Sequence, residues 1–397
     1  MALLKQIATV AGGSAAGQLI VFATTPWLAR MYAPAAFGHY AAFVSMCSVF
    51  ITIACFRYDA ALNAADEQDV APAYWVASIA IGTTMVLAAC FASLPWGRGV
   101  LQRIIGPEAN AVRVAVAALA CGLFQLTGAA AIRQGHFAYS SLLRLAQPAV
   151  FSAAALLLPI GLVNSCLVGF LMSVPFAAVH WRRQHWAGFA KVAQTARGLR
   201  EFPLVSLPTA LLDAVSLAMP VWFISSRYSP ADAGNYAQVQ RLLSAPLMLL
   251  AIAVGQVYLK RAGDIVRAHQ SARPFQRRVV TYLMLGAAIL LLGVLVLGSP
   301  VLSIFLGHGW RTDTTFLTLV FWPVAVRSCV SPVTGIFIVR NRLRLGALWQ
   351  VLYFCATSAV FLSLAGRVPL ERLLIAVAIS ETTCYGIYVY IADQVAR

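Results

Sequence analysis

Long runs without charged residues constrain this chain more than any other feature. A hydrocarbon core about 30 Å thick needs about 20 apolar residues per helix, and cutting the 397 residues at charges and at Pro/Gly breaks gives twelve such spans. The clearest runs are 6–29, 38–56, 70–97, 114–132, 242–259 and 345–366. Because 61% of the residues are hydrophobic and only 11% are charged, no water-soluble fold of this size can bury the apolar surface. The sequence predicts an all-α polytopic membrane protein.

The other six spans are longer than one crossing or carry single charges. The run 145–181 is long enough for two helices and divides near residues 159–164, whereas 279–310 holds one helix followed by a loop. Asp213, Arg327 and Glu381 each lie inside one of the three remaining spans, 202–226, 313–339 and 373–391.

The distribution of basic residues predicts the orientation of the spans. An even number of spans puts both termini on one side, and nineteen of the 29 Lys and Arg residues fall on that side. By the positive-inside rule, the N- and C-termini are cytoplasmic. The net charge of +16 does not indicate nucleic acid, because basic loops beside apolar helices face lipid headgroups.

An internal repeat predicts two related halves. Tyr32-Ala-Pro-Ala-Ala-Phe-Gly-His-Tyr-Ala41 recurs as Tyr228-Ser-Pro-Ala-Asp-Ala-Gly-Asn-Tyr-Ala237, with six of ten positions identical. Each copy reads as a tight turn that opens a helix at its proline. With six spans per copy the repeat is parallel, and in transporters with such repeats the substrate path runs between the halves. We expect helical bundles at 1–181 and 202–397, joined by a basic amphipathic cytoplasmic linker at 182–201. The alternative is that the duplicated bundles pack together with no path between them.

Polar residues inside the spans are the candidate functional residues, because an ionisable group at the centre of a bilayer costs at least about 2.5 to 3.5 kcal/mol. Arg327 is central in its span, and Arg241 lies about 10 Å past Gly234 at about 1.5 Å per residue. Asp213 and Glu381 are the best-placed acids. All four are in the second half. The first half is expected to be nearly devoid of buried charge, with Gln18 and Gln125 as its polar candidates.

Two interpretations of these charges stay open from the residues alone. Arg241 and Arg327 offer bidentate donors that suit an anionic headgroup such as a pyrophosphate. Alternatively, Arg241 pairs with Asp213 and Arg327 with Glu381 as structural bridges. The two acids are candidates for binding a coupling H⁺ or Na⁺, or are simple hydrogen-bond acceptors. Arg57 and Asp59 follow the second span and are expected to be loop charges, with gating of the cytoplasmic mouth as the alternative.

Sequence motifs for catalysis are missing. The chain has no GxxxxGK[ST] phosphate loop, no HExxH and no CxxC pair. Membrane enzymes that build polymers present a catalytic site on a sizeable outer loop, and no such loop is present. We expect no enzyme activity, no cofactor and no metal site.

Several segments together resemble a known family. They include Phe56-Arg57-Tyr58-Asp59-Ala-Ala-Leu62, Glu201-Phe-Pro203 followed by Ser206-Leu-Pro208, Gly234-Asn-Tyr-Ala-Gln-Val-Gln-Arg241 and Phe305-Leu-Gly-His-Gly-Trp310. In order and spacing, over nearly the whole chain, they are similar to the polysaccharide biosynthesis (oligosaccharide flippase) family. The resemblance implies the fold of the multidrug/oligosaccharidyl-lipid/polysaccharide exporter superfamily, in which two six-helix bundles form a V around a central cavity.

The resemblance also implies a function. Members flip undecaprenyl-diphosphate-linked oligosaccharide from the cytoplasmic to the periplasmic leaflet of the bacterial inner membrane, for O-antigen, capsule or exopolysaccharide. It assigns Arg57 and Arg241 to recurrent arginines of the family. Besides the lipid-linked substrate and membrane lipid, the candidate partners are a counter-ion, a polysaccharide polymerase and a chain-length regulator. The alternatives are a multidrug or other lipid-precursor exporter of the superfamily, and a non-transport component of polysaccharide assembly.

Overall fold

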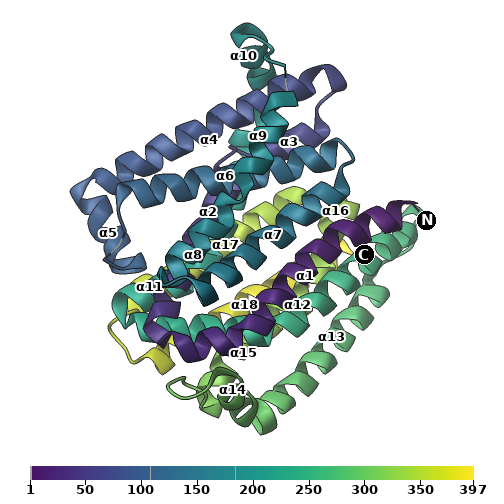
Figure 1. Ribbon diagram of the computed structural model, residues 1–397. Coiled ribbons are helices and arrows are strands. Elements are labelled where there is room, and N and C mark those ends of the chain that lie inside the picture. Colours follow the sequence, from purple (N-terminus) through teal and green to yellow (C-terminus); the bar gives the residue numbers. More distant parts are fainter. Residues whose placement is uncertain (1, 108, 184) are drawn as a thin grey trace. The chain divides into compact units, whose positions relative to one another are not determined.

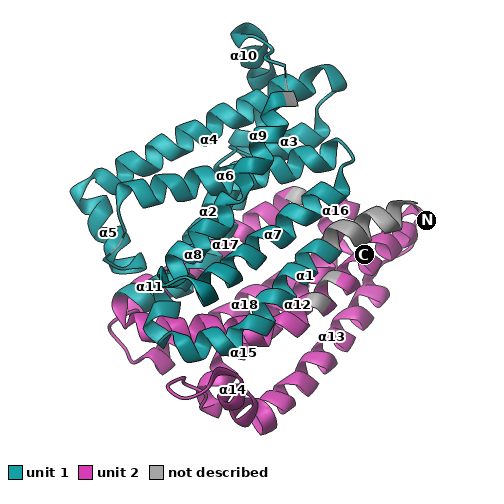
Figure 2. Ribbon diagram, in the orientation of Figure 1, with its two compact units in different colours: residues 1–226 teal, residues 227–397 magenta. Residues whose placement is uncertain are grey.

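The computed structural model describes residues 2–107, 109–183 and 185–397 (Figure 1). Every element assigned within these ranges is a helix. By their internal contacts the residues divide into two compact units, residues 1–226 and 227–397 (Figure 2).

Unit 1 consists of long helices and of short ones that connect them. Its elements are α1 (Ala2–Met31), α2 (Pro34–Ile53), α3 (Tyr58–Ala64), η1 (Glu67–Asp69), α4 (Val70–Ser93), α5 (Pro95–Ile105), α6 (Ala111–Arg133), α7 (Phe137–Leu157), α8 (Gly161–Leu171), α9 (Ser173–Arg183), α10 (Phe189–Gly198), η2 (Phe202–Ser206) and α11 (Leu207–Arg227). Small residues allow α1 to approach α7 closely, since a side chain carbon added at Gly17 would lie 2.6 Å from Pro148 Cγ.

Unit 2 repeats the alternation of long and short helices. Its elements are α12 (Pro230–Arg267), α13 (Arg273–Gly293), η3 (Val294–Gly298), α14 (Ser299–Leu306), α15 (Thr314–Val330), η4 (Ser331–Gly335), α16 (Ile336–Val339), α17 (Leu343–Leu364) and α18 (Leu370–Val395). Stacked aromatic rings fill part of its core, with the Trp349 and Tyr388 ring centroids 4.0 Å apart.

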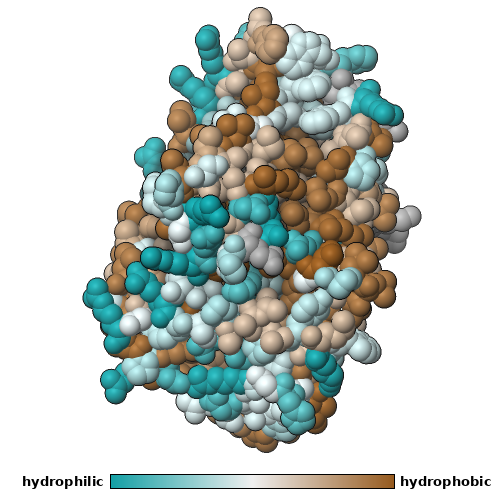
Figure 3. Space-filling model, turned by 60° about the vertical axis from the view of Figure 1, so that its left-hand side comes forward, coloured by the Kyte–Doolittle hydropathy of each residue, from teal (hydrophilic) through white to brown (hydrophobic). Residues whose placement is uncertain are grey.

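Each of the twelve predicted spans coincides with a helix. Ten continuous stretches in the described part of the chain are long and apolar enough to cross a membrane, and the bent α12 is an eleventh. The first predicted span corresponds to the 30-residue α1. Only 22% of the most apolar window of Arg273–Leu306 is buried within the protein, and apolar side chains cover much of the face in Figure 3. Such outward-facing surface suits a multi-pass membrane protein, because lipid replaces water as its solvent.

The predicted repeat has a structural counterpart in each unit. Pro34 begins α2 and Pro230 begins α12, as expected for a preset φ at the first helical position. Tyr32 donates its hydroxyl to the carbonyl of Ala155 at 2.9 Å, and Tyr228 donates to the carbonyl of Val368 at 2.8 Å. Both acceptors lie at or beside the connection between the last two spans of their half. The two tyrosines therefore make equivalent hydrogen bonds, from equivalent turns to equivalent ends of the two bundles.

The seventh predicted span makes contacts within unit 1. Trp222 Nε1 donates to the Ala42 carbonyl at 3.2 Å, and Ser225 Oγ donates to the Ile104 carbonyl at 2.8 Å. These hydrogen bonds join α11 to helices of the first unit, although the sequence repeat assigns α11 to the second copy. The domain boundary at residue 202 stays a prediction.

The predicted linker contains the short helix α10, which forms polar contacts with the rest of unit 1. Lys191 Nζ lies 2.9 Å from Asp69 Oδ1, which also accepts a hydrogen bond from Thr195 Oγ1. On the outside, Trp186 and Phe189 leave 47% and 78% of their surface exposed. Phe189 and the basic Lys191 and Arg197 on this short helix, with Trp186 just before it, agree with the predicted amphipathic character.

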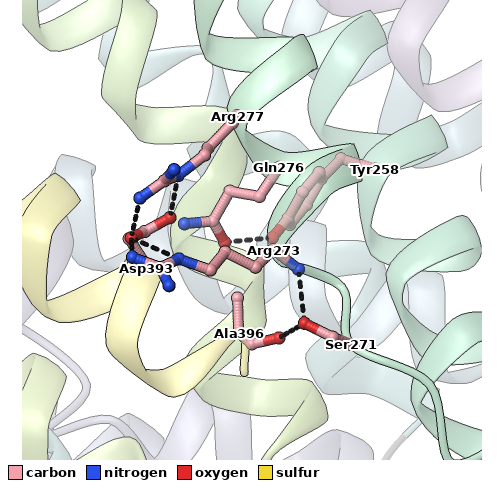
Figure 4. A network of polar contacts seen from close by, with 7 residues as sticks. All are labelled: Tyr258, Ser271, Arg273, Gln276, Arg277, Asp393 and Ala396. Atoms are coloured by element: carbon pink, nitrogen blue, oxygen red, sulfur yellow. Dashed lines mark hydrogen bonds and ion pairs between the residues drawn. The ribbon is translucent and has the colours of Figure 1, made fainter.

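A polar clamp joins the beginning of α13 to the end of α18 (Figure 4). Asp393 accepts from Arg273 Nη2 at 2.7 Å and from Arg277 Nε at 2.8 Å. Beside it, the Ala272 amide donates to the Ala396 carbonyl at 2.9 Å. Charged and backbone groups together therefore hold these two helix ends to each other.

Candidate polar sites within the spans

Arg57 occupies a strained turn at the end of the second span. Helix α2 ends at Ile53, and the chain then passes through Phe56 with φ 47° and Arg57 with φ 65° before α3 begins. Two successive non-glycine residues in the left-handed region are unusual, and each costs about 1 to 3 kcal/mol. Backbone strain of this kind persists only where the surroundings enforce it, and it clusters at functional sites.

Asp59, two residues further on, anchors the chain directly after the turn. Only 3% of Asp59 is exposed, and its Oδ2 accepts a hydrogen bond from Gln125 Nε2 of α6 at 2.7 Å. Its other oxygen, Oδ1, is buried without a partner among the described residues. Tyr58 adds a second tether, donating its hydroxyl to the Ala196 carbonyl of α10 at 3.3 Å. The start of α3, directly after the turn, is thus fixed by two hydrogen bonds.

This arrangement corrects two expectations. Asp59 is not a loop charge, because α3 returns the chain into the bundle and buries the carboxylate. The first half is therefore not nearly devoid of buried charge. Gln125 donates to Asp59 and so supports the Arg57 turn from within the bundle, and its contact with substrate stays a prediction.

Arg57 and Asp213 line one cavity in unit 1. The cavity has a volume of about 360 Å³ and is formed by α2, the Arg57 turn and α11. Its lining residues are Ser45, Ser48, Thr52, Arg57, Ala210, Asp213, Ala214, Leu217 and Ala218. Arg57 Nε donates to Ser206 Oγ at 3.3 Å, which directs the guanidinium toward α11. Two charges of opposite sign, three hydroxyls and small residues therefore surround the space.

The hydroxyls of this cavity are oriented by their own helix. Ser45, Ser48 and Thr52 each donate to the carbonyl four residues earlier, at 2.8 to 3.0 Å. Their oxygen lone pairs consequently remain as acceptors toward the cavity, while Arg57 supplies donors. The cavity can hold a group that carries both negative charge and hydroxyls.

A second polar cluster lies inside unit 2. Arg327 Nη2 is 3.2 Å from Glu381 Oε1 and 2.7 Å from the Tyr353 hydroxyl. The guanidinium also lies 6.0 Å and 5.9 Å from the ring centroids of Tyr353 and Tyr385. Glu381 is only 5% exposed. The bridge between Arg327 and Glu381, one of the two interpretations, is therefore present in the structure.

The remaining candidates are not brought together with these clusters. Arg241 is half-buried in α12, and none of the described carboxylates of unit 2 pairs with it. Gln18 is exposed on α1. The alternative pair of Arg241 with Asp213 joins residues of different units and stays a prediction. For Asp59, which was considered only as a loop charge or a gating residue, the sequence interpretation missed the burial inside the bundle.

Comparison with known proteins shows similarity over nearly the whole chain. The family model described as polysaccharide biosynthesis protein matches residues 27–314. A search of curated proteins finds no match. Among solved structures, the lipid II flippase MurJ in an inward closed conformation is similar with a TM-score of 0.71 at 10% identity, covering 98% of this chain and 89% of its own.

Two MATE transporter structures are similar at lower scores. The MATE transporter VcmN of Vibrio cholerae gives a TM-score of 0.55 at 13% identity and covers 99% of this chain and 96% of its own. The MATE multidrug transporter DinF-BH, solved as a ligand complex, gives 0.50 at 12% identity, with 97% and 92% covered. At such identities the matches show the fold alone. They confirm the predicted all-α membrane fold of about twelve spans.

Proposed function

Because the chain belongs to the family of polysaccharide biosynthesis proteins, we propose that it flips undecaprenyl-diphosphate-linked oligosaccharide from the cytoplasmic to the periplasmic leaflet of the bacterial inner membrane. Its fold is that of the multidrug/oligosaccharidyl-lipid/polysaccharide exporter superfamily. The similarity to a lipid II flippase supports a lipid-linked substrate, and the family supports a saccharide headgroup.

The observation that carries this proposal is the cavity beside Arg57. An oligosaccharide diphosphate cannot cross hydrocarbon unaided, because its hydroxyls and charges would lose their hydration without replacement. The Arg57 guanidinium supplies donors for phosphate oxygens. Asp213 and the serine and threonine hydroxyls supply acceptors for sugar hydroxyls. The polyprenyl tail stays in the surrounding lipid.

In this mechanism the protein acts by binding and by alternating access. Substrate bound at the cavity shifts the equilibrium between conformations only by as much as its affinity differs between them. The strained Arg57 turn, held by Asp59 and Gln125, keeps the guanidinium in place before substrate arrives, so less ordering is needed on binding. We also infer that the chain catalyses no covalent step, and that Asp213 or Glu381 takes the coupling H⁺ or Na⁺.

A second candidate function rests on the similarity to the two MATE transporters. An exporter of amphipathic cations would use Asp213 as the counter-charge in the cavity. The nearby Arg57 opposes that use, because it repels a cation at the same cavity. A polysaccharide polymerase and a chain-length regulator are the partners we propose for the flippase.

The test is transbilayer movement in liposomes. The purified protein is reconstituted with a fluorescent diphosphate-linked polyprenyl oligosaccharide, and protection from an external quencher is followed over time. We expect movement above that of protein-free vesicles, strongly slowed in Arg57→Ala and unchanged in Arg267→Ala, whose exposed guanidinium pairs with Asp264. Export of a cationic dye with no movement of the lipid would instead establish the second candidate.

A further inference from the structure

A second polar cavity of unit 1 lies at the other end of α2 from the Arg57 turn. It has a volume of about 180 Å³ and is formed by the starts of α2, α6 and α8 and by the end of α5. His39, in the second turn of α2, lines it. Thr52, which lines the Arg57 cavity, is about 20 Å further along the helix axis at about 1.5 Å per residue. The proposed function makes no use of this second cavity.

Polar side chains from three different helices line the cavity. Arg113 of α6 and His39 of α2 contribute a guanidinium and an imidazole, and both residues are half-buried. Asn164 of α8 donates its Nδ2 to the Ile160 carbonyl at 2.8 Å, so its Oδ1 is kept as an acceptor for the cavity. No aspartate or glutamate of the described residues lines the space. The cavity therefore combines a permanent positive charge with neutral hydrogen-bonding groups.

Two glycines with positive φ shape the surroundings of these groups. Gly106 has φ 103°, and a Cβ added there would lie 3.1 Å from three atoms of the His39 ring. The backbone at Gly106 therefore packs against the imidazole and holds its orientation. Gly161 has φ 78° at the start of α8, and an added Cβ would meet nothing within 4 Å. Open space thus lies beside the first turn of α8, whose amides have no carbonyl partner within their own helix and favour negative charge.

The chemistry and the size of the cavity together select the ligand. Its volume is below the about 300 to 1,000 Å³ of pockets for drug-sized molecules, so it suits a single sugar ring. A carboxylate matches the planar fork of Arg113, and ring hydroxyls can donate to Asn164 Oδ1 and bond with His39. Apolar walls at Ile105 and Leu162 suit the C–H face of the ring. We propose that this cavity is a subsite for an acidic sugar, a pyranose that carries a carboxylate.

The subsite deepens the proposed function and rests on it for its natural ligand, an acidic residue of the lipid-linked oligosaccharide. With the predicted cytoplasmic termini, the start of α2 faces the periplasm and the Arg57 turn faces the cytoplasm. The Arg57 cavity then receives the headgroup where it enters, and the second cavity holds one of its sugars where it leaves. The saccharides that this chain accepts are accordingly expected to contain an acidic sugar.

Binding to the purified full chain tests the subsite without any transport step. The protein in nanodiscs is titrated with glucuronate, glucose and inorganic phosphate, and binding is followed by saturation-transfer NMR. We expect glucuronate to bind more tightly than glucose, and Arg113→Gln to weaken glucuronate at least tenfold, the usual loss for a charge-assisted hydrogen bond. Asn164→Asp also weakens glucuronate, because a second carboxylate repels it, and leaves glucose unchanged. Arg103→Gln is the matched control, since Arg103 is exposed in the last turn of α5 and does not line the cavity.

The three probes and the control separate the outcomes. A loss of glucuronate alone in Arg113→Gln supports the acidic-sugar subsite, whereas an equal loss of phosphate shows a general oxyanion site and overturns the assignment to a sugar. Unchanged glucuronate binding in Arg113→Gln, or an equal loss in Arg103→Gln, overturns the subsite. If Arg113→Gln melts early, Arg113→Lys and Asn164→Asp give the same comparison in folded protein. Normal glucuronate binding without transbilayer movement of the lipid refutes the flippase and leaves the subsite intact, and movement without glucuronate binding does the reverse.

Discussion

Replacing Glu381 by glutamine removes the counter-charge of Arg327 while keeping the size of the side chain. Glu381 Oε1 accepts from Arg327 Nη2 at 3.2 Å and from the Tyr353 hydroxyl at 2.5 Å. Removing one partner of a fully buried pair costs about 3 to 5 kcal/mol. The Arg327 side chain is 32% exposed, so part of its charge stays hydrated. We expect Glu381→Gln to lower the free energy of unfolding by about 2 kcal/mol.

The measurement is reversible unfolding in mixed micelles, followed by the intrinsic fluorescence of the nine tryptophans, of which Trp349 stacks on Tyr353. Glu371→Gln is the matched control, because Glu371 pairs with Arg311 at 2.6 Å near the surface, where both side chains are over 30% exposed. Such a pair contributes about 0 to 1 kcal/mol.

A double variant separates the pair from its individual residues. Arg327→Met in the Glu381→Gln background removes the charge that the single variant leaves unpaired, while glutamine still accepts from Tyr353. We expect the double variant to be more stable than Glu381→Gln alone. The reasoning fails if Glu381→Gln loses no more than the Glu371 control, or if the double variant is the less stable of the two.

Four other predictions each concern a single strained or hydrogen-bonded residue. Arg57→Gly relieves a positive φ and raises the unfolding free energy by up to about 1 kcal/mol, while transport in liposomes falls, because glycine suits the left-handed region but carries no guanidinium. Gln125→Leu leaves the Asp59 carboxylate without its hydrogen bond and costs about 2 kcal/mol, seen as a lower melting temperature. Tyr228→Phe deletes one hydroxyl contact and costs about 1 kcal/mol in the same assay. Partial burial raises the pKa of Asp313, but hydrogen bonds from the Arg311 guanidinium and the Phe316 amide outweigh burial and lower the pKa. The stabilisation from Asp313 is therefore present at neutral pH and is lost as pH falls through the lowered value, and in Asp313→Asn this acid-side part of the melting profile is absent.

The spans and the repeat could be predicted from sequence, because both depend on residue type along the chain. Apolar length sets the helices, and Pro34 and Pro230 mark where two of them begin. The pairing of Arg327 with Glu381 could be stated only as one of two alternatives, since the sequence does not say which faces of α15 and α18 meet.

The Arg57 turn could not be predicted, and the reason is local. Neither Phe56 nor Arg57 belongs to a residue type that favours positive φ, so nothing in the sequence indicates a left-handed turn. Without that turn, Asp59 reads as a loop residue at the membrane surface. Its burial follows from α3 packing back against α6, a contact between residues 66 positions apart.

The clamp between α13 and α18 has a consequence for how unit 2 is assembled. Arg273 and Asp393 are 120 positions apart, and Arg277 and Asp393 are 116 apart. During synthesis, α13 enters the membrane with two cationic groups whose shared acceptor does not yet exist. Until about 120 more residues have been made, water or lipid phosphate must neutralise those groups. The clamp of unit 2 therefore forms late, and a ribosome-stalled chain that ends before Asp393 should present α13 in a state that proteases can distinguish from the finished protein.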